Sequence, residues 1–354
     1  MSNLILPSLE ISRFRAFEHL QIDHLNRVNL IVGKNNVGKT SLLEAIQLYA
    51  RNGSPKFILE LLEARDEKQV ANLNNLSAID FQDILPGLKY IFFGRKEITN
   101  LLETVRIGPV NDPNKTLTLT IGGFDFLNTV DDQGPRLSIH LGQQQLVNFS
   151  IHSSTYPRLP LTELKGIPCI SISSNGLSRR LIGGLWDNIA LTSLEQEIRA
   201  ALQLIAPGTE AIGFVGDPLS GSGRIPIVKI NNIEEPLPLR SLGDGMQRLF
   251  GIVLALVNAR NGLLLIDEFE NGLYYTVQPD VWRLIFQLAR RLNTQVFATT
   301  HSWDCIEAFQ KAAQEDTQDG ALLIRLENIK GKIVPTLFDE RKLGIATRDH
   351  IEVR

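Results

Sequence analysis

The sequence is poor in cysteine. Cys169 and Cys305 are the only two in 354 residues, and they lie far apart. This argues against a disulfide-stabilised scaffold and against a zinc site built from cysteines. No apolar run approaches the roughly 20 residues that a membrane-spanning helix needs. The start, MSNLILPSLEIS, lacks the basic segment and long apolar core of a signal peptide. We therefore expect a cytoplasmic protein that does not contact a membrane.

Strong charge of either sign is also missing. The net charge is −3, so the chain as a whole is not a binder of polyanions, although a local basic patch remains compatible with it. Hydrophobic residues make up 43% and charged residues 21%, which is the composition of a globular protein with a sizeable core. The length predicts one large domain or two. We find no internal repeat and no sustained heptad pattern.

The most informative stretch is GKNNVGKT, from Gly33 to Thr40. It matches G-x-x-x-x-G-K-[ST], the phosphate-binding loop. An apolar strand candidate precedes it at 27–32, and apolar residues at helical spacing follow it at 41–48. In such a loop the backbone N–H groups and the helix N-terminus bind phosphate, Lys39 reaches the β- and γ-phosphates, and the threonine hydroxyl ligates Mg²⁺. The residues expected to bind the nucleotide are Gly33, Asn35, Asn36, Gly38, Lys39, Thr40 and Ser41.

Polar residues follow two apolar strand candidates in the last third of the chain. The first strand ends in Asp267 and Glu268, which predicts a buried parallel strand that carries carboxylates to its C-terminal end. We expect Asp267 to share Mg²⁺ with Thr40, and Glu268 to polarise the attacking water as a catalytic residue. The second strand ends in His301, which we expect to hydrogen-bond the γ-phosphate as a further catalytic residue.

A second candidate anion site contains Ser241, Gly243 and Gly245, just before a long apolar helix at 249–259. Small residues at a helix N-terminus leave N–H groups free to bind phosphate. Taken alone, the stretch would be better explained as an ordinary glycine-rich turn and helix cap. Its interpretation therefore depends on the other motifs of the chain.

These motifs, in this order, resemble ABC-type ATPases of the RecF/SMC/OLD group, and in particular the stand-alone bacterial AAA15/AAA21-type ATPases, which are OLD-like but lack a Toprim domain. The resemblance is dense over 8–50 and 236–310 and thin over 51–235. The similar segments are the opening strand at 11–17, the Walker A loop at 33–40, a divergent signature motif at 241–248, the Walker B segment at 263–268, the D-loop region at 270–273 and the H-loop at 299–302.

The resemblance implies an α/β fold, a P-loop NTPase of ABC-ATPase type. It has a mixed sheet flanked by helices, an N-terminal antiparallel β element, and an α+β insert between Walker A and the signature. We expect a split ATPase core at 1–50 and 236–310. Residues 51–235 would form the insert, partly core strands and partly a helical and β lobe, and 311–354 a C-terminal hairpin and tail.

Two further expectations concern single elements and the end of the chain. Residues 185–206 predict an amphipathic helical region, with Thr192 or Ser193 as a plausible N-cap ahead of Glu195 and Gln196. About 50 residues follow His301, fewer than a nuclease domain needs, so any nuclease would be a separate protein. Acids there, namely Asp316, Asp319, Asp339 and Glu340, are interpreted as solvated turn residues.

The resemblance further implies ATP hydrolysis at a dimer interface. Ser241, Gly243 and Gly245 of one subunit would face the γ-phosphate held by Lys39 of the other. One chain supplies one loop and one signature, so two copies give two complete sites. We therefore expect a Mg²⁺-dependent ATPase that switches a separate effector, such as a Toprim-like nuclease, or a DNA transaction in DNA maintenance or phage defence. The alternatives are the ATPase subunit of a membrane transporter and a nucleotide-binding module without turnover.

Two features stay open in the sequence. No Q-loop glutamine can be singled out among Gln82, Gln133 and the run 143–145. Short basic pairs at 95–96 and 179–180 are possible DNA phosphate contacts, but such pairs are more often solvated surface.

Overall fold

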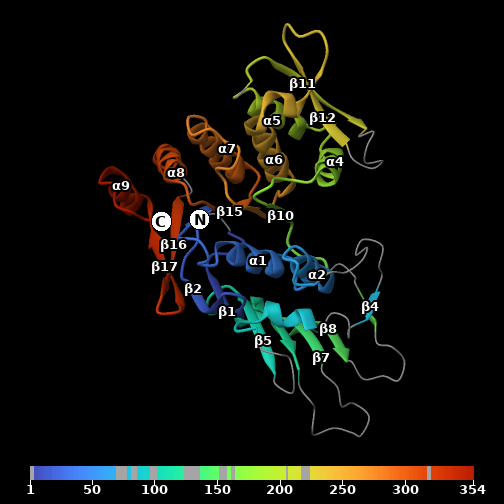
Figure 1. Ribbon diagram of the computed structural model, residues 1–354, viewed down its shortest axis with the longest axis vertical. Helices are drawn as coiled ribbons and strands as arrows, with labels where there is room; N and C mark the ends of the chain where they lie inside the picture. Colours follow the sequence, from blue (N-terminus) through green and yellow to red (C-terminus); the bar gives the residue numbers. More distant parts are fainter. Residues whose placement is uncertain are drawn as a thin grey trace.

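A computed structural model shows the arrangement of the chain. It describes residues 4–68, 78–80, 86–95, 102–122, 136–150, 158–160, 164–204, 206–216, 224–316 and 320–354. A central sheet lies between a lobe of antiparallel strands and a lobe made mainly of helices (Figure 1). Within the described residues, no helix combines the length and the apolar character needed to cross a membrane.

The central sheet has six strands in the order β10-β14-β15-β3-β16-β17. Its strands are β10 (Cys169–Ile172), β14 (Leu263–Ile266), β15 (Gln295–Thr299), β3 (Val28–Val32), β16 (Ala321–Ile329) and β17 (Lys332–Phe338). The first five pair in parallel, and β17 pairs with β16 antiparallel. Strands β3, β14 and β15 are buried along their whole length. Helices cover both faces of a parallel sheet, so the side chains on both faces lie in the core.

The second sheet is antiparallel, in the order β2-β1-β5-β6-β7-β8. Its strands are β1 (Leu9–Phe14), β2 (Phe17–Ile22), β5 (Glu103–Gly108), β6 (Leu117–Ile121), β7 (Arg136–Leu141) and β8 (Gln144–Ser150). Helices α1 (Lys39–Ala50) and α2 (Pro55–Glu63) pack between the two sheets and share one apolar core with them (Figure 1). The N-terminal β element thus continues into strands from the region between Walker A and the signature.

A second apolar core lies on the other face of the central sheet. It contains α4 (Arg179–Asp187), α5 (Ser193–Leu202), α6 (Asp244–Asn258), α7 (Gln278–Arg291), α8 (Trp303–Glu315) and the hairpin of β11 (Thr209–Gly216) and β12 (Arg224–Ile230). The remaining elements are β4 (Ala78–Asp80), η2 (Lys89–Ile91), η3 (Pro113–Lys115), β9 (Arg158–Pro160), β13 (Leu237–Pro238), η4 (Leu239–Leu242) and α9 (Glu340–Arg348). Helices α6 and α7 lie between the central sheet and the outer lobe that contains α4 and β12 (Figure 1).

The fold confirms the prediction of a mixed sheet flanked by helices with an antiparallel N-terminal element. The helical region predicted over 185–206 is divided into two helices, and Thr192, one of its two predicted N-caps, is confirmed as the N-cap of α5. The helix α4 ends at Asp187 and α5 begins at Ser193. Between them Leu191 has a φ of 62°, and the Thr192 side chain accepts a hydrogen bond from the Leu194 N–H as the N-cap of α5.

The interpretation of the C-terminal acids as solvated turn residues is wrong for Asp316, whose side chain is 10% exposed, and for Glu340, which is half-buried in α9, whereas Asp339 is exposed just ahead of α9. Asp339 is the N-cap of α9, because its side chain accepts from the Lys342 N–H at 2.8 Å. Glu340 Oε1 accepts from the Ala321 N–H at 3.1 Å. Asp316 lies 2.5 Å from an Arg290 guanidinium nitrogen. Asp316 thus joins the end of α8 to α7, Glu340 joins α9 to β16, and Asp319 lies outside the described residues.

Candidate nucleotide-binding site

The loop between β3 and α1 sits at the carboxyl edge of the parallel strands, where ligands bind in open α/β sheets. Two of its glycines are dictated by space and by backbone angle. Gly33 has a φ of 147°, and a Cβ there would lie 2.5 Å from the Leu326 carbonyl oxygen. Gly38, the N-cap of α1, has a φ of 92°, and its Cβ would meet the Phe17 ring at 3.0 Å. The neighbouring structure therefore requires glycine at both ends of the loop.

Lys39 is the first residue of α1, and its side chain folds back over the loop. Its Nζ donates to the carbonyl oxygens of Gly33, at 2.6 Å, and Lys34, at 3.1 Å. Burial lowers the pKa of this ammonium group, and the carboxylates of Asp267, Glu268 and nearby Glu270 act against the shift. The ammonium group is therefore held at the loop, on the side of the carboxylates.

A threonine from the loop helix meets an aspartate from β14. Thr40 Oγ1 donates to Asp267 Oδ2 at 3.1 Å. Thr299, at the end of β15, donates to the other carboxylate oxygen at 2.6 Å, and its hydroxyl also accepts from the Glu268 N–H at 2.9 Å. The structure thus brings Thr40 and Asp267 together, and it adds Thr299, which was not among the expected site residues.

These oxygens suit a divalent cation. Hydroxyl and carboxylate oxygens are ligands that Mg²⁺ accepts, and Mg²⁺ in nucleotide sites uses few protein ligands besides phosphate and water oxygens. The described residues contain no group of three or more His, Cys, Asp and Glu side chains that could hold a metal by themselves. The donor set of Thr40 and Asp267 therefore fits a magnesium ion that is shared with a nucleotide.

Glu268 and His301 lie at the same edge of the sheet. Glu268 has a φ of 49°, a left-handed conformation uncommon outside glycine. The Asn271 side-chain N–H₂ donates to Glu268 Oε2 at 2.7 Å and so fixes this carboxylate. The His301 ring follows β15, and its Nδ1 lies 3.2 Å from Glu270 Oε1. Backbone strain of this kind concentrates at functional sites.

The loop opens into a cavity of about 900 Å³, which brings most of the expected site residues together. Its lining includes Asn35, Asn36, Gly38, Lys39, Thr40, Ser41, Asp267, Glu268 and His301. It also includes Arg15, Arg65 and Arg95, which were not expected here. The cavity thus has carboxylates at one part of its lining and guanidinium groups at another, as a magnesium–triphosphate pair requires.

Arg15 and Arg65 share a carboxylate on the loop helix. Glu44, in the second turn of α1, lies 2.9 Å from Arg15 Nε and 2.8 Å from Arg65 Nε. Burial raises the pKa of the Glu44 carboxyl group, and the two arginines oppose that shift. Arg65 Nη2 also lies 3.4 Å from the Ser41 hydroxyl. Arg95, a possible DNA contact in the sequence, lies instead at this cavity, and its neighbour at position 96 is outside the described residues.

The signature residues lie elsewhere in the chain. Ser241 is in η4, Gly243 is the N-cap of α6 with a φ of 95°, and Gly245 is in the first turn of α6. Among the described residues that line the loop cavity, none belongs to this segment. A single chain therefore does not bring the two anion sites together.

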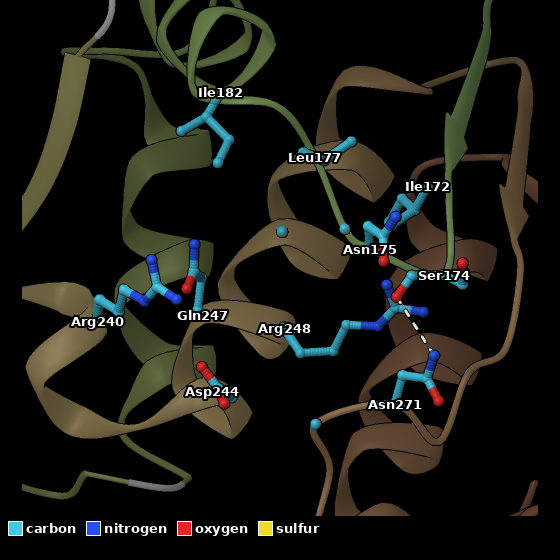
Figure 2. A pocket seen from close by; sticks show the side chains of 13 residues that line it. Ile172, Ser174, Asn175, Leu177, Ile182, Arg240, Asp244, Gln247, Arg248 and Asn271 are labelled. Carbon is cyan, nitrogen blue, oxygen red and sulfur yellow. Dashed lines mark hydrogen bonds between the residues drawn. The ribbon is translucent and has the colours of Figure 1, made fainter. Parts of the chain in front are cut away.

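A second cavity, of about 350 Å³, lies between α6 and the loops after β10 and β14 (Figure 2). Figure 2 shows the Arg248 side chain extending from α6 between Ser174 and Asn271. Arg248 donates to three carbonyl oxygens, those of Ser173 at 2.9 Å and of Asp267 and Glu268 at 2.8 Å each. The first turns of α6 are thereby tied to the segment that carries the two acids.

The Q-loop and one basic pair can be placed only in part. The run at 143–145 is exposed around the β7–β8 turn, away from both cavities, and Gln82 and Gln133 lie outside the described residues. The segment that leaves β10 beside the site carries Ser174 and Asn175 instead of glutamine. Residues 179–180 begin α4 and line neither cavity.

Comparisons with known proteins agree with this geometry. The family described as "AAA ATPase domain" matches residues 5–119, and the family described as "AAA domain, putative AbiEii toxin, Type IV TA system" matches residues 187–304. An ATP/GTP phosphatase of Helicobacter pylori is 23% identical over 88% of this chain and 89% of its own length. Together these likenesses support an ATPase of the ABC, RecF and SMC type.

Other relatives of this ATPase extend the likeness to the fold. RecF of Heliobacterium modesticaldum is 26% identical over 35% of the chain, and the match spans only 33% of RecF. An SMC head bound to the C-winged helix domain of ScpA superposes with a TM-score of 0.54 at 13% identity, covering 95% of this chain and 99% of the other. The Pyrococcus furiosus Smc head gives 0.50 at 11% identity, over 98% and 99%. At these identities the structures report the fold alone.

Proposed function

We propose that this ATPase is a Mg²⁺-dependent switch that dimerises around two composite ATP sites and controls a separate effector or a DNA transaction. The observation that carries the proposal is the convergence of a cation, a hydroxyl–carboxylate pair and two candidate catalytic side chains at one cavity. Those residues are Lys39, Thr40, Asp267, Glu268 and His301.

The nucleotide would enter with its phosphates against the loop. The backbone N–H groups of the loop and the N-terminus of α1 would bind the phosphates. Lys39 would exchange its two carbonyl partners for phosphate oxygens, which suit an ammonium group better. Thr40 and Asp267 would hold Mg²⁺, which neutralises charge on the phosphates when bound. Ser41, with Arg65 beside it, adds donors at the far side of the loop.

The two candidate catalytic residues would act at the γ-phosphate. Glu268, held by Asn271, would orient the attacking water through its free carboxylate oxygen. His301 would donate a hydrogen bond to the γ-phosphate and stabilise the charge that develops on it. Both side chains follow buried strands, so their backbones are fixed before the nucleotide arrives.

The dimer completes this arrangement. Ser241, Gly243 and Gly245 stand outside the loop cavity of their own chain, and the N–H groups at the start of α6 receive no side-chain cap. In a symmetric dimer they would contact the γ-phosphate held by the second copy. Because that contact exists only while the γ-phosphate is present, hydrolysis would release the two chains.

The partner would be a separate protein, such as a Toprim-like nuclease, or DNA, in a cytoplasmic role in DNA maintenance or phage defence. The SMC head relative was solved with a protein partner, and RecF is named for DNA replication and repair. Both likenesses support a switch that acts on another macromolecule.

The proposal is tested by phosphate release with and without Mg²⁺, together with the mass of the Glu268→Gln variant. We expect release that EDTA abolishes. The variant should bind ATP, lose release, and shift from monomer to dimer with ATP, because trapped γ-phosphate holds the interface. A variant that stays monomeric with saturating ATP would contradict the composite site. ATP binding without any release, with DNA or a partner present, would leave a nucleotide-binding module.

A further inference from the structure

The turn after β14 places a buried carboxylate against the histidine of the H-loop. Glu270 Oε1 accepts from the His301 backbone N–H at 3.1 Å and lies 3.2 Å from the ring Nδ1. The Glu270 side chain is 11% exposed, whereas the His301 side chain is 54% exposed. We propose that Glu270 is the positioning residue of His301 and holds the ring with Nδ1–H toward itself and Nε2 toward the nucleotide. This inference rests on the proposed function of the site.

An exposed imidazole needs such a partner. A neutral histidine has two tautomers, and a half-exposed ring can turn about its side-chain bonds. A carboxylate beside Nδ1 keeps a proton on that nitrogen and turns Nε2 toward the cavity, where Nε2 can donate to the γ-phosphate when the ring carries both protons. A single oxygen of Glu270 contacts both the backbone and the ring of His301, which fixes the position and the orientation together.

The backbone of Glu270 is held by a hydrogen bond, and its side chain lowers the stability of the fold. Its carbonyl accepts from the Leu273 N–H at 2.9 Å in the turn after β14. Its second carboxylate oxygen, Oε2, is buried and has no hydrogen-bond partner among the described residues. A buried oxygen without a partner destabilises the fold, so its presence calls for a functional explanation. The contact with His301 supplies that explanation.

The pair also joins the two catalytic elements. Glu270 follows β14 and is two residues beyond Glu268, while His301 follows β15. Glu270 is, after burial itself, the largest influence on the pKa of Arg248, where its charge opposes the lowering that burial causes. The carboxylate thus lies between the signature helix and the H-loop. Loss of Glu270 would free His301 without touching the nucleotide.

The experiment combines kinetics with a spectroscopic readout. Glu270→Gln keeps a neutral oxygen for the backbone N–H, and Glu270→Ala removes it. We expect kcat to fall roughly 10-fold in the first and roughly 100-fold in the second, with KM changed by less than about twofold, because the nucleotide contacts stay. The matched control is Glu307→Gln, which alters a carboxylate that accepts from a ring N–H, that of Trp303, at 2.7 Å, outside the site. It should leave kcat unchanged.

A double-mutant cycle separates positioning from general damage. In a His301→Ala background, Glu270→Gln should cause no further loss, since Glu270 acts through His301. Additive losses would overturn the proposal. Nitrogen NMR of ¹⁵N-histidine protein, with the signal among the 6 histidines assigned by His301→Ala, should show a protonated Nδ1 that Glu270→Gln depopulates. An unprotonated Nδ1, or one unaffected by the substitution, would also overturn it. If the wild type released no phosphate, the proposed function would fail while the NMR result still decided the role of Glu270.

Discussion

The phosphate loop and the start of α6 are two anion sites built in opposite ways. At the loop, the chain closes around its glycines, and a Cβ at Gly33 would lie 2.5 Å from a carbonyl oxygen. At α6, a Cβ on Gly243 would meet nothing within 4 Å. Both positions have positive φ, yet only the loop is shaped by its own chain. We call the loop the closed site and the start of α6 the open site, whose open space agrees with the proposal that a second copy of the chain completes it.

The largest effect is expected at the closed site. Lys39→Ala removes the cation that faces Asp267 and Glu268, and we expect ATP binding to weaken at least roughly 100-fold because a charge-assisted contact to phosphate is lost. Titration with a fluorescent ATP analogue measures this. The control is Lys34→Ala, since that side chain is exposed on the same loop. Equal losses in both variants would show that general positive charge, not the Lys39 position, binds the nucleotide.

A substitution at the open site should lower phosphate release while ATP affinity is retained. Gly243→Asp places a negative side chain in open space at the N-terminus of α6. The φ of 95° strains any residue with a Cβ, but no neighbouring atom blocks the side chain, so we expect a folded variant that binds ATP with nearly unchanged affinity. We expect phosphate release to fall roughly 100-fold, because a carboxylate there would repel the γ-phosphate of the second copy. Gly331→Asp, which also has a positive φ and open space in the β16–β17 turn, is the matched control. Lost ATP affinity in Gly243→Asp would contradict the separation of the two sites.

Arg248 connects the open site to the closed one. Arg248→Ala would leave three partly buried carbonyl oxygens without their donor, and we expect the free energy of unfolding to fall by about 3 kcal/mol. Phosphate release should fall roughly tenfold with ATP affinity retained, since the acids of β14 lose their support. Chemical denaturation and steady-state kinetics measure the two effects. Unchanged kinetics in a folded variant would mean that α6 and β14 are not coupled.

The smallest effect should lie outside both sites. Asp339→Ala removes the N-cap of α9, and we expect a loss of about 1 kcal/mol in the free energy of unfolding. Phosphate release by the folded protein should not change, because α9 lines neither cavity. A large kinetic effect would show that the C-terminal elements take part in the site.

The same contrast explains what the sequence reveals. The loop and the β14 acids are contiguous motifs whose spacing carries their geometry, so their residues can be found by pattern. Arg248 contacts carbonyl oxygens, and its hydrogen bond to Ser173 spans 75 positions of the chain, so no local sequence motif predicts this contact. Thr299 and Glu270 are common residues whose roles depend on the pairing of β14 with β15. These contacts arise from the packing of strands that are distant in the chain, and that packing cannot be predicted from the residue pattern of a single sequence.

Local structure was missed for a different reason. The N-cap of α5 at Thr192 can be found in the sequence, but the end of α4 at Asp187 and the left-handed conformation of Leu191 carry no such signal. The helix α9 has few apolar residues, and it is held by Asp339 and by contacts with the end of the sheet. In both places tertiary contacts decide against the local preference of the sequence.

The most direct test of the composite site mixes two inactive chains. Lys39→Ala lacks the closed site and Gly243→Asp lacks the open one, so each homodimer should release almost no phosphate. A mixed dimer has one intact pair of half-sites, and an equal mixture should recover about a quarter of wild-type release if chains exchange freely. Recovery in the mixture is the result that two half-sites predict. A mixture as inactive as its parts, with mixed dimers shown by mass, would contradict the account.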